Sequence, residues 1–266
     1  MIEKYIVELK AGLCSPAFFV HKYLMIVVTL TSWTKRIGSV KKVVESIMSN
    51  TLPPDRLYLN LSSEEFKGIE LPMDLTDYFK SDSRLIINWV DGQNTKSMKK
   101  IFPILKYLND DDIIIDADDD ILFPKDLIES RVDDFEKNGR KYCISSNPHN
   151  SVGFNGKMKV ISATSLFQKK MLKHWDIILT ENVLKTYNDD RTYLTLLWLN
   201  GYINIGPSKW SVQELLEKFD MKLDGSMKEK KTYLCGSAYD RVVAGEFKKL
   251  ARKDMLVSFA YFRNKK

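Results

Sequence analysis

The sequence contains little cysteine and no glycine-rich phosphate loop. Its three cysteines, Cys14, Cys143 and Cys235, are widely separated, form no Cys-x-x-Cys pair and leave an odd thiol, which favours a reducing compartment. No Gly-x-Gly-x-x-Gly follows the first predicted strand, and no Walker-type loop ends in Lys-Ser or Lys-Thr. Neither a dinucleotide-binding fold nor a P-loop is therefore supported.

Long hydrophobic runs are missing as well. Residues 18–30 form the longest apolar stretch near the N-terminus, but His21 and Lys22 interrupt it. It is too short to cross a bilayer, which takes about 20 apolar residues. The first residues lack the pattern of a secretory signal, because Glu3 and Lys10 carry charge before any apolar block. Together with the cysteine content, this predicts a cytoplasmic protein.

No charge of either sign dominates the composition. The 41 Lys and Arg residues exceed the 35 Asp and Glu residues by only six. This mildly basic balance is compatible with anionic substrates or an anionic membrane surface, and it is too weak to argue for nucleic-acid binding. With 266 residues, 44% of them hydrophobic, the chain is long enough for one large domain with a sizeable core, alone or with a small appendage.

Short apolar runs alternate with amphipathic segments in the first half of the chain. The pattern predicts strands over 25–30, 57–61, 85–90 and 113–115, and helices over 40–48 and 96–108. Such an alternation is typical of an α/β protein with a doubly wound, mostly parallel sheet. Ligands bind beyond the carboxyl ends of the strands in such sheets. We therefore expect the polar strand tips to converge on one crevice, namely residues 31–36, Ser62, Asp91 and 116–120.

The second half of the chain is less regular. Its apolar residues predict strands over 141–145, 160–161 and 202–205, and helices over 166–172, 193–199 and 210–219. Asn200-Gly201 is typical of a helix C-terminus. Ser211, with Glu214 three residues later, has the pattern of a capping box.

The densest group of chemically active side chains follows the strand predicted over 113–115. Residues 113–124 read Ile-Ile-Ile-Asp-Ala-Asp-Asp-Asp-Ile-Leu-Phe-Pro, with carboxylates at Asp116, Asp118, Asp119 and Asp120. Like charges this close are costly unless a cation lies among them. Mg²⁺ and Mn²⁺ prefer oxygen ligands, which carboxylates supply. The buried strand before the run favours a metal site over a solvated acidic loop.

Two other classes of metal protein place Asp residues this densely. An EF-hand loop starting at Asp116 would need Gly where Ile121 stands and Glu where Leu127 stands, so it is excluded. A phosphatase of the haloacid dehalogenase type also carries Asp-x-Asp at a strand tip, which Asp116 and Asp118 match. Such enzymes need a later Lys and a further acidic pair, for which Asp189-Asp190 is a loose candidate. This phosphatase remains the alternative enzyme.

Three stretches carry a resemblance to a known family. Residues 29–37 read Thr-Leu-Thr-Ser-Trp-Thr-Lys-Arg-Ile, residues 91–101 contain a Lys-Lys pair, and residues 115–124 contain Asp-Asp-Asp-Ile-x-x-Pro. Together they resemble GT-A glycosyltransferases, specifically the inverting, family-2-like bacterial enzymes that build lipopolysaccharide and capsule. The matching region covers about half of the chain. Asp189-Asp190, followed by an apolar helix, is similar to the acidic pair where inverting members carry their base.

The resemblance implies a Rossmann-like GT-A fold with a smaller C-terminal region on the acceptor side. We expect an N-terminal extension over 1–24, the catalytic domain over 25–206, and a helical region rich in basic and aromatic residues over 207–266. The implied reaction moves a hexosyl or N-acetylhexosaminyl group from a UDP-sugar to a glycan or lipid-linked oligosaccharide. The basic, aromatic tail would suit contact with the inner membrane surface. A non-catalytic carbohydrate- or metal-binding domain that kept the fold is the alternative from another class.

The resemblance also implies a role for each residue that matches the family pattern. Asp118 and Asp120 would hold Mn²⁺ or Mg²⁺, although Asp116 leaves open which two carboxylates bind the ion. Asp190, or Asp189, would take the proton of the acceptor hydroxyl in a single inverting displacement. The residues expected to bind the nucleotide-sugar are Thr31, Arg36, Asp91, Lys99, Lys100, Asp118 and Asp119.

Overall fold

The structure is a computed structural model of the 266-residue chain, and it describes residues 24–145, 150–151, 158–159, 164–187 and 189–223. Nearly all of the N-terminal extension, the strand predicted over 160–161 and the tail beyond residue 223 lie outside these ranges. No helix in the described part of the chain is long and apolar enough to cross a membrane.

The core of the fold is a mixed sheet of seven strands in the order β3-β2-β1-β4-β8-β5-β9. The first four strands along the chain are parallel neighbours, while β8 runs antiparallel between β4 and β5. A separate antiparallel pair joins β6 and β7. The strands are β1 (Ile26–Thr31), β2 (Arg56–Ser62), β3 (Leu85–Val90), β4 (Ile113–Ala117), β5 (Cys143–Ile144), β6 (Asn150–Ser151), β7 (Met158–Lys159), β8 (Leu166–Gln168) and β9 (Asn204–Ile205).

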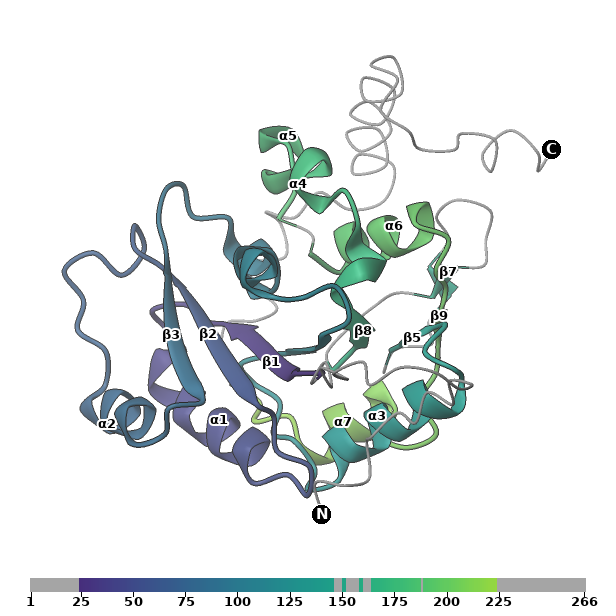
Figure 1. Ribbon diagram of the computed structural model, residues 1–266. Helices are drawn as coiled ribbons and strands as arrows, with labels where there is room; N and C mark the ends of the chain where they lie inside the picture. The colour runs from purple at the N-terminus through teal and green to yellow at the C-terminus, as the bar shows by residue number, and fades with distance from the viewer. Residues whose placement is uncertain (1–23, 146–149, 152–157, 160–163, 188, 224–266) are drawn as a thin grey trace, which may run out of the picture.

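Helices cover both faces of this sheet. Figure 1 shows α1, α3 and α7 on one side and α4, α5 and α6 on the other. The α-helices are α1 (Val40–Met48), α2 (Met73–Ser81), α3 (Leu127–Lys137), α4 (Trp175–Ile178), α5 (Glu181–Leu184), α6 (Asp189–Leu199) and α7 (Val212–Lys218). The 3₁₀ helices are η2 (Ile37–Ser39), η3 (Lys96–Lys100), η4 (Phe102–Tyr107) and η5 (Lys169–Leu172). The arrangement confirms the predicted α/β fold with a mostly parallel sheet.

The central strands are buried on both faces, which explains their continuous apolar runs. Every residue of β4 is buried, and so are the four inner residues of β1. The register places Thr29 of β1 beside Asp116 of β4, and Thr31 beside Asn60 of β2. Because parallel strands end at the same edge, this register brings the polar tips of β1, β2 and β4 together.

Three predicted segments differ from the structure. The helix expected over 96–108 is two consecutive 3₁₀ helices, because Pro103 begins a new first turn and Lys96 adopts a positive φ of 51°. The helix expected over 166–172 begins as β8, whose backbone pairs with the edge of β4 before η5 follows. A short apolar run of this kind fits either structure. Helix α2 was not predicted, since only Leu75 and Phe79 on it are buried.

The segments on either side of α7 contact α3 and the main chain that follows β4. Arg131 of α3 is buried and donates hydrogen bonds to the carbonyls of Lys209 and Trp210, both at 2.7 Å. After the helix, Leu122 N donates to Phe219 O at 2.9 Å and Met221 N donates to Asp120 O at 2.8 Å. The predicted capping box is confirmed, with Ser211 and Glu214 bonded reciprocally. Residues 209–221 therefore hold the main chain that follows β4.

Candidate active site

Asp116 is the most deeply buried carboxylate of the acidic run. It belongs to β4 and is fully buried, and its Oδ1 accepts a 2.5 Å hydrogen bond from Ser165 N. Its Oδ2 accepts no hydrogen bond from the part of the chain that the structure describes. Burial raises the pKa of Asp116 to about 7, against the opposing charge of Lys100. A buried carboxylate with one unsatisfied oxygen is unusual unless the site binds something.

Lys100 is the cation at the centre of the site. Its Nζ lies 2.6 Å from Asp118 Oδ1, 3.2 Å from Asp189 Oδ2 and 3.9 Å from Asp116 Oδ2. Burial acts to lower its pKa, but the charges of the surrounding carboxylates, Asp118 first, outweigh burial and raise the pKa of Lys100 well above its ordinary value. Lys100 therefore stays an ammonium ion and joins β4, the acidic loop and α6.

Polar side chains inside the buried strands fix the position of Lys100. Its carbonyl oxygen accepts hydrogen bonds from Thr29 Oγ1 at 2.5 Å and from Asn60 Nδ2 at 3.1 Å. Asn88 of β3 donates in turn to Asn60 Oδ1 at 2.7 Å. Neither Asn60 nor Asn88 is among the site residues predicted from the sequence. Each is a polar residue in the middle of an otherwise apolar strand. Because buried polar groups need hydrogen-bond partners, this pattern could have indicated that both residues hold another group in place.

Arg36 is a second cation, bound to the other half of the acidic run. Its Nη1 lies 2.6 Å from Asp119 Oδ1 and 2.9 Å from Asp120 Oδ2. Ser32 Oγ donates to the second oxygen of Asp119 at 2.6 Å. Burial and then the charge of Asp118 raise the pKa of Asp120 to about 6, while Arg36 lowers it. Asp118 and Asp120 therefore have different side-chain partners, Lys100 for Asp118 and Arg36 for Asp120.

The metal site that the sequence predicts at Asp118 and Asp120 can be tested against this geometry. Within the described residues, no group of three or more His, Cys, Asp or Glu side chains is arranged to hold a metal ion. Mg²⁺ commonly binds through one or two carboxylates and completes its coordination with water and substrate phosphates. Asp118 and Asp120 keep 32% and 20% of their side-chain surface exposed, so they suit such a two-carboxylate site. The residues present fit a divalent ion that is bound together with a phosphate ligand.

Helix α6 begins at this site with the predicted acidic pair. Asp189 is buried against Lys100, and Asp190 is partly exposed beside it. Burial, followed by the charge of Asp189, raises the pKa of Asp190 well above its ordinary value. One turn later, the buried Tyr193 hydroxyl forms no hydrogen bond with any described residue. Acidic residues also suit the first turn of a helix, because they complement its dipole.

The side chains of the remaining predicted residues have partners outside the acidic run. Lys99 directs its Nζ to Asn94 Oδ1 at 2.5 Å, and burial lowers the pKa of its ammonium group. Asp91 is exposed at the end of β3, where Ser63 Oγ donates to it at 2.7 Å. Thr31 Oγ1 donates to the carbonyl of Asn60 at 2.7 Å. Their roles toward a nucleotide stay predictions.

Comparisons with known proteins bear on the fold. No protein-family model matches this sequence, and no curated protein matches it. Among solved structures, the chain is similar to TarS of S. aureus, with a TM-score of 0.50 and 12% identity over 71% of this chain and 36% of TarS. It is also similar to TarS 1–349 in complex with UDP-GlcNAc, with a TM-score of 0.51 and 11% identity over 70% of this chain and 57% of that one.

A third similar structure comes from another organism. The mannosyltransferase PcManGT from Pyrobaculum calidifontis, in complex with GDP-Man and Mn²⁺, gives a TM-score of 0.50 and 16% identity over 71% of this chain and 56% of that one. In all three comparisons the matched region is less than two thirds of the other chain. At these identities the likeness shows the fold alone. It confirms the expected α/β arrangement, that of GT-A glycosyltransferases.

Proposed function

We propose that the protein is a glycosyltransferase that moves a sugar from a UDP-sugar to a glycan acceptor. The observation that carries the proposal is the convergence of the acidic run, Lys100, Arg36 and the start of α6 at one edge of a GT-A fold. The complexes of the similar structures with UDP-GlcNAc, and with GDP-Man and Mn²⁺, support a nucleotide-sugar donor and a divalent ion.

The site has the charges that departure of a nucleoside diphosphate needs. Mn²⁺ or Mg²⁺ held by Asp118 and Asp120 would supply the positive charge that neutralises the diphosphate. Lys100 and Arg36 already lie against these carboxylates, so each can contact phosphate oxygens with a small side-chain movement. The buried side chain of Lys100 keeps its charge in a region of low dielectric, where it stabilises a developing anion more than it would in water.

Asp190 is the better candidate for the catalytic base. Asp189 is occupied by the ammonium group of Lys100, whereas Asp190 is partly exposed at the start of α6. A carboxylate with a raised pKa is a stronger base than an ordinary one and can take the acceptor proton more effectively. We propose that Asp190 removes that proton in a single displacement that inverts the anomeric centre.

The proposal also covers where in the cell the protein acts and on which acceptor. A lipid-linked acceptor, and a place in lipopolysaccharide or capsule synthesis at the inner membrane face, rest on the sequence resemblance and on the basic aromatic tail. The part of that tail beyond residue 223 lies outside the described residues.

The first test is release of UDP from a panel of UDP-sugars, measured with Mn²⁺, with Mg²⁺ and with EDTA. We expect slow hydrolysis of one donor, lost in EDTA and restored by the metal, because the diphosphate needs the ion to leave. Release that is unchanged in EDTA would contradict metal dependence. If no UDP-sugar or GDP-sugar is bound or hydrolysed, the enzyme proposal fails. A phosphatase screen then tests the remaining enzyme alternative.

The pH dependence of transfer tests the assignment of the base. Only ionised Asp190 can accept a proton, so activity is present above its pKa and is lost as the pH falls through it. Because burial and Asp189 raise that pKa, the acidic limb of kcat/KM should lie well above pH 4, where an ordinary aspartate titrates. A rate that stays flat down to pH 4 would exclude Asp190 as the base. Loss of the acidic limb in Asp190→Asn, with only residual activity, would support it.

A further inference from the structure

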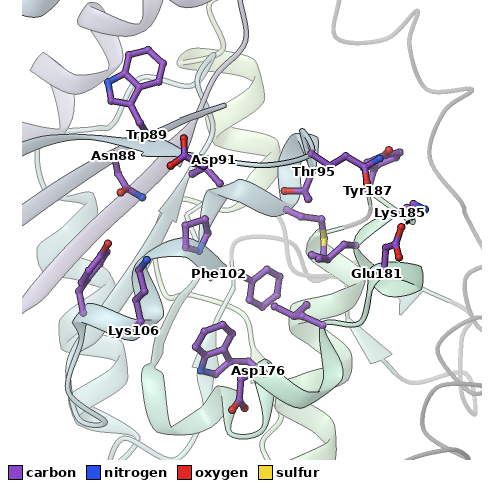
Figure 2. Close-up of a pocket in the computed structure, with 18 residues that line it drawn as sticks. Asn88, Trp89, Asp91, Thr95, Phe102, Lys106, Asp176, Glu181, Lys185 and Tyr187 are labelled. Carbon is purple, nitrogen blue, oxygen red and sulfur yellow. Dashed lines mark hydrogen bonds and ion pairs between the residues drawn. The ribbon is translucent and has the colours of Figure 1, made fainter. Parts of the chain in front are cut away.

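A cavity of about 740 Å³ lies on the side of η3 and η4 toward the edge strand β3. Its walls are β3 with the loop that follows, the segment η3–η4, and the short helices α4 and α5 (Figure 2). This volume is within the range of small-molecule sites, which is roughly 300 to 1,000 Å³. Of the residues predicted to bind the nucleotide-sugar, Asp91 lines this cavity, whereas no residue of the acidic run does.

The lining combines aromatic and other apolar side chains with polar and charged ones. Phe102, Pro103 and Trp175 are among the apolar lining residues, and Tyr107, which is 54% exposed, also lines the cavity. Asn88 and Asp176 add polar groups to the lining, and Figure 2 shows both among the side chains around the cavity. Aromatic faces pack against the apolar faces of sugar rings, while amides and carboxylates accept or donate to their hydroxyls. The combination favours a ligand with both kinds of surface.

The charges of the cavity disfavour an anionic ligand. Asp91, Asp176 and Glu181 outnumber Lys106 and Lys185 among the lining residues. Lys185 is already paired with Glu181 at 2.5 Å, and the Nζ of Lys106 lies over the ring of Tyr107 at 4.8 Å. The net negative charge of the lining would therefore repel a phosphate group, whereas it would not repel a neutral polyhydroxyl ligand.

The cavity is connected to the acidic cluster through two sets of contacts. Asn88 lines the cavity and holds Asn60, which in turn holds the carbonyl of Lys100. Tyr187 also lines the cavity, and its carbonyl accepts a 2.9 Å hydrogen bond from Ser97 Oγ. Two residues later α6 begins with its acidic pair. The cavity is therefore linked to the proposed reaction site by hydrogen bonds that involve residues of η3.

We propose that this cavity binds a neutral saccharide unit of the acceptor, away from the sugar that receives the transferred group. The inference rests on the proposed function, because it assumes that a glycan reaches the acidic cluster. The aromatic side chains of the lining stack on one sugar ring, and its polar and acidic side chains select hydroxyl groups over phosphate.

The proposal is tested by saturation-transfer NMR with the full chain and no donor present. The probes are cellobiose, chitobiose, lactose and maltose, with uridine monophosphate as a separate arm. We expect a saturable signal from at least one disaccharide, weakened about fivefold or more in Tyr107→Ala, which removes an exposed ring and spares the core. Asp176→Asn should weaken it as well. Ile69→Ala, which truncates an exposed side chain (46%) away from the cavity, is the control and should change nothing.

Three results would overturn the proposal. They are no signal from any disaccharide, a signal that is equal in Tyr107→Ala and Ile69→Ala, or a uridine monophosphate signal that Tyr107→Ala weakens. Donor hydrolysis, measured separately on the same protein preparations, distinguishes this inference from the proposed function. Hydrolysis without disaccharide binding refutes the cavity alone. Cavity binding when no donor is bound or hydrolysed supports a saccharide site and refutes the enzyme.

Discussion

Replacing Asp120 with Asn is expected to lower sugar transfer by about a thousandfold or more. The change removes one of the two carboxylates that would hold the divalent ion, and such an ion contributes several kcal/mol to charge stabilisation in the transition state. Release of UDP with saturating Mn²⁺ measures the effect. A fully active Asp120→Asn protein would refute the assignment of the site.

The fold of this variant should be unaffected, so the loss can be attributed to chemistry. An Asn side chain has nearly the same shape and can still accept a hydrogen bond from Arg36 through its amide oxygen. The backbone contact from Met221 N to the carbonyl at position 120 does not involve the side chain. Asp110→Asn is the matched control, because Asp110 is exposed and precedes β4 at the opposite end of the strand. Its activity and thermal unfolding should equal those of the unmodified protein.

The sequence was sufficient for the elements whose pattern is local and continuous. The apolar runs of β1 to β4 identify strands, because they are too short for buried helices and end in polar residues. Residues 166–172 were misassigned because their conformation depends on pairing with β4, about 50 residues earlier in the chain. No local pattern reports such a contact. The break between η3 and η4 was foreseeable from Pro103, a signal that the helical spacing of its neighbours outweighed.

Prediction of the site had a similar limit. The acidic run and Arg36 were expected to share one crevice, and the family resemblance assigned Lys100 and Asp189 to the same site. The structure brings these side chains into contact. The division into two groups, one around Lys100 and one around Arg36, depends on which way each side chain of the run points. That direction is set by the turn after β4 and by residues 209–221, which hold it from the far end of the chain. Spacing within the sequence could not supply this information.

Replacing Lys100 with Met is expected to destabilise the protein by about 3 to 5 kcal/mol, because three carboxylates would lose their buried cation. For a domain of this size, that corresponds to a fall in Tm of at least roughly 6 °C. Thermal unfolding at pH 7 measures it. The matched control is Lys99→Met, which removes a neighbouring buried lysine whose nearest carboxylate, in Glu65, lies 3.6 Å away. The control should cost clearly less.

The origin of the effect can be isolated with a second substitution. If the loss comes from uncompensated negative charge, adding Asp189→Asn to Lys100→Met should recover part of the stability, because one repelling carboxylate is removed. In the presence of Lys100, Asp189→Asn should instead destabilise the protein, since it removes an ion pair. This reversal of sign is specific to an electrostatic role. Equal costs for Lys100→Met and Lys99→Met, with no recovery in the double variant, would mean that Lys100 matters only for packing. In that case, a group other than Lys100 would have to compensate the negative charge of the carboxylates in the ligand-free protein.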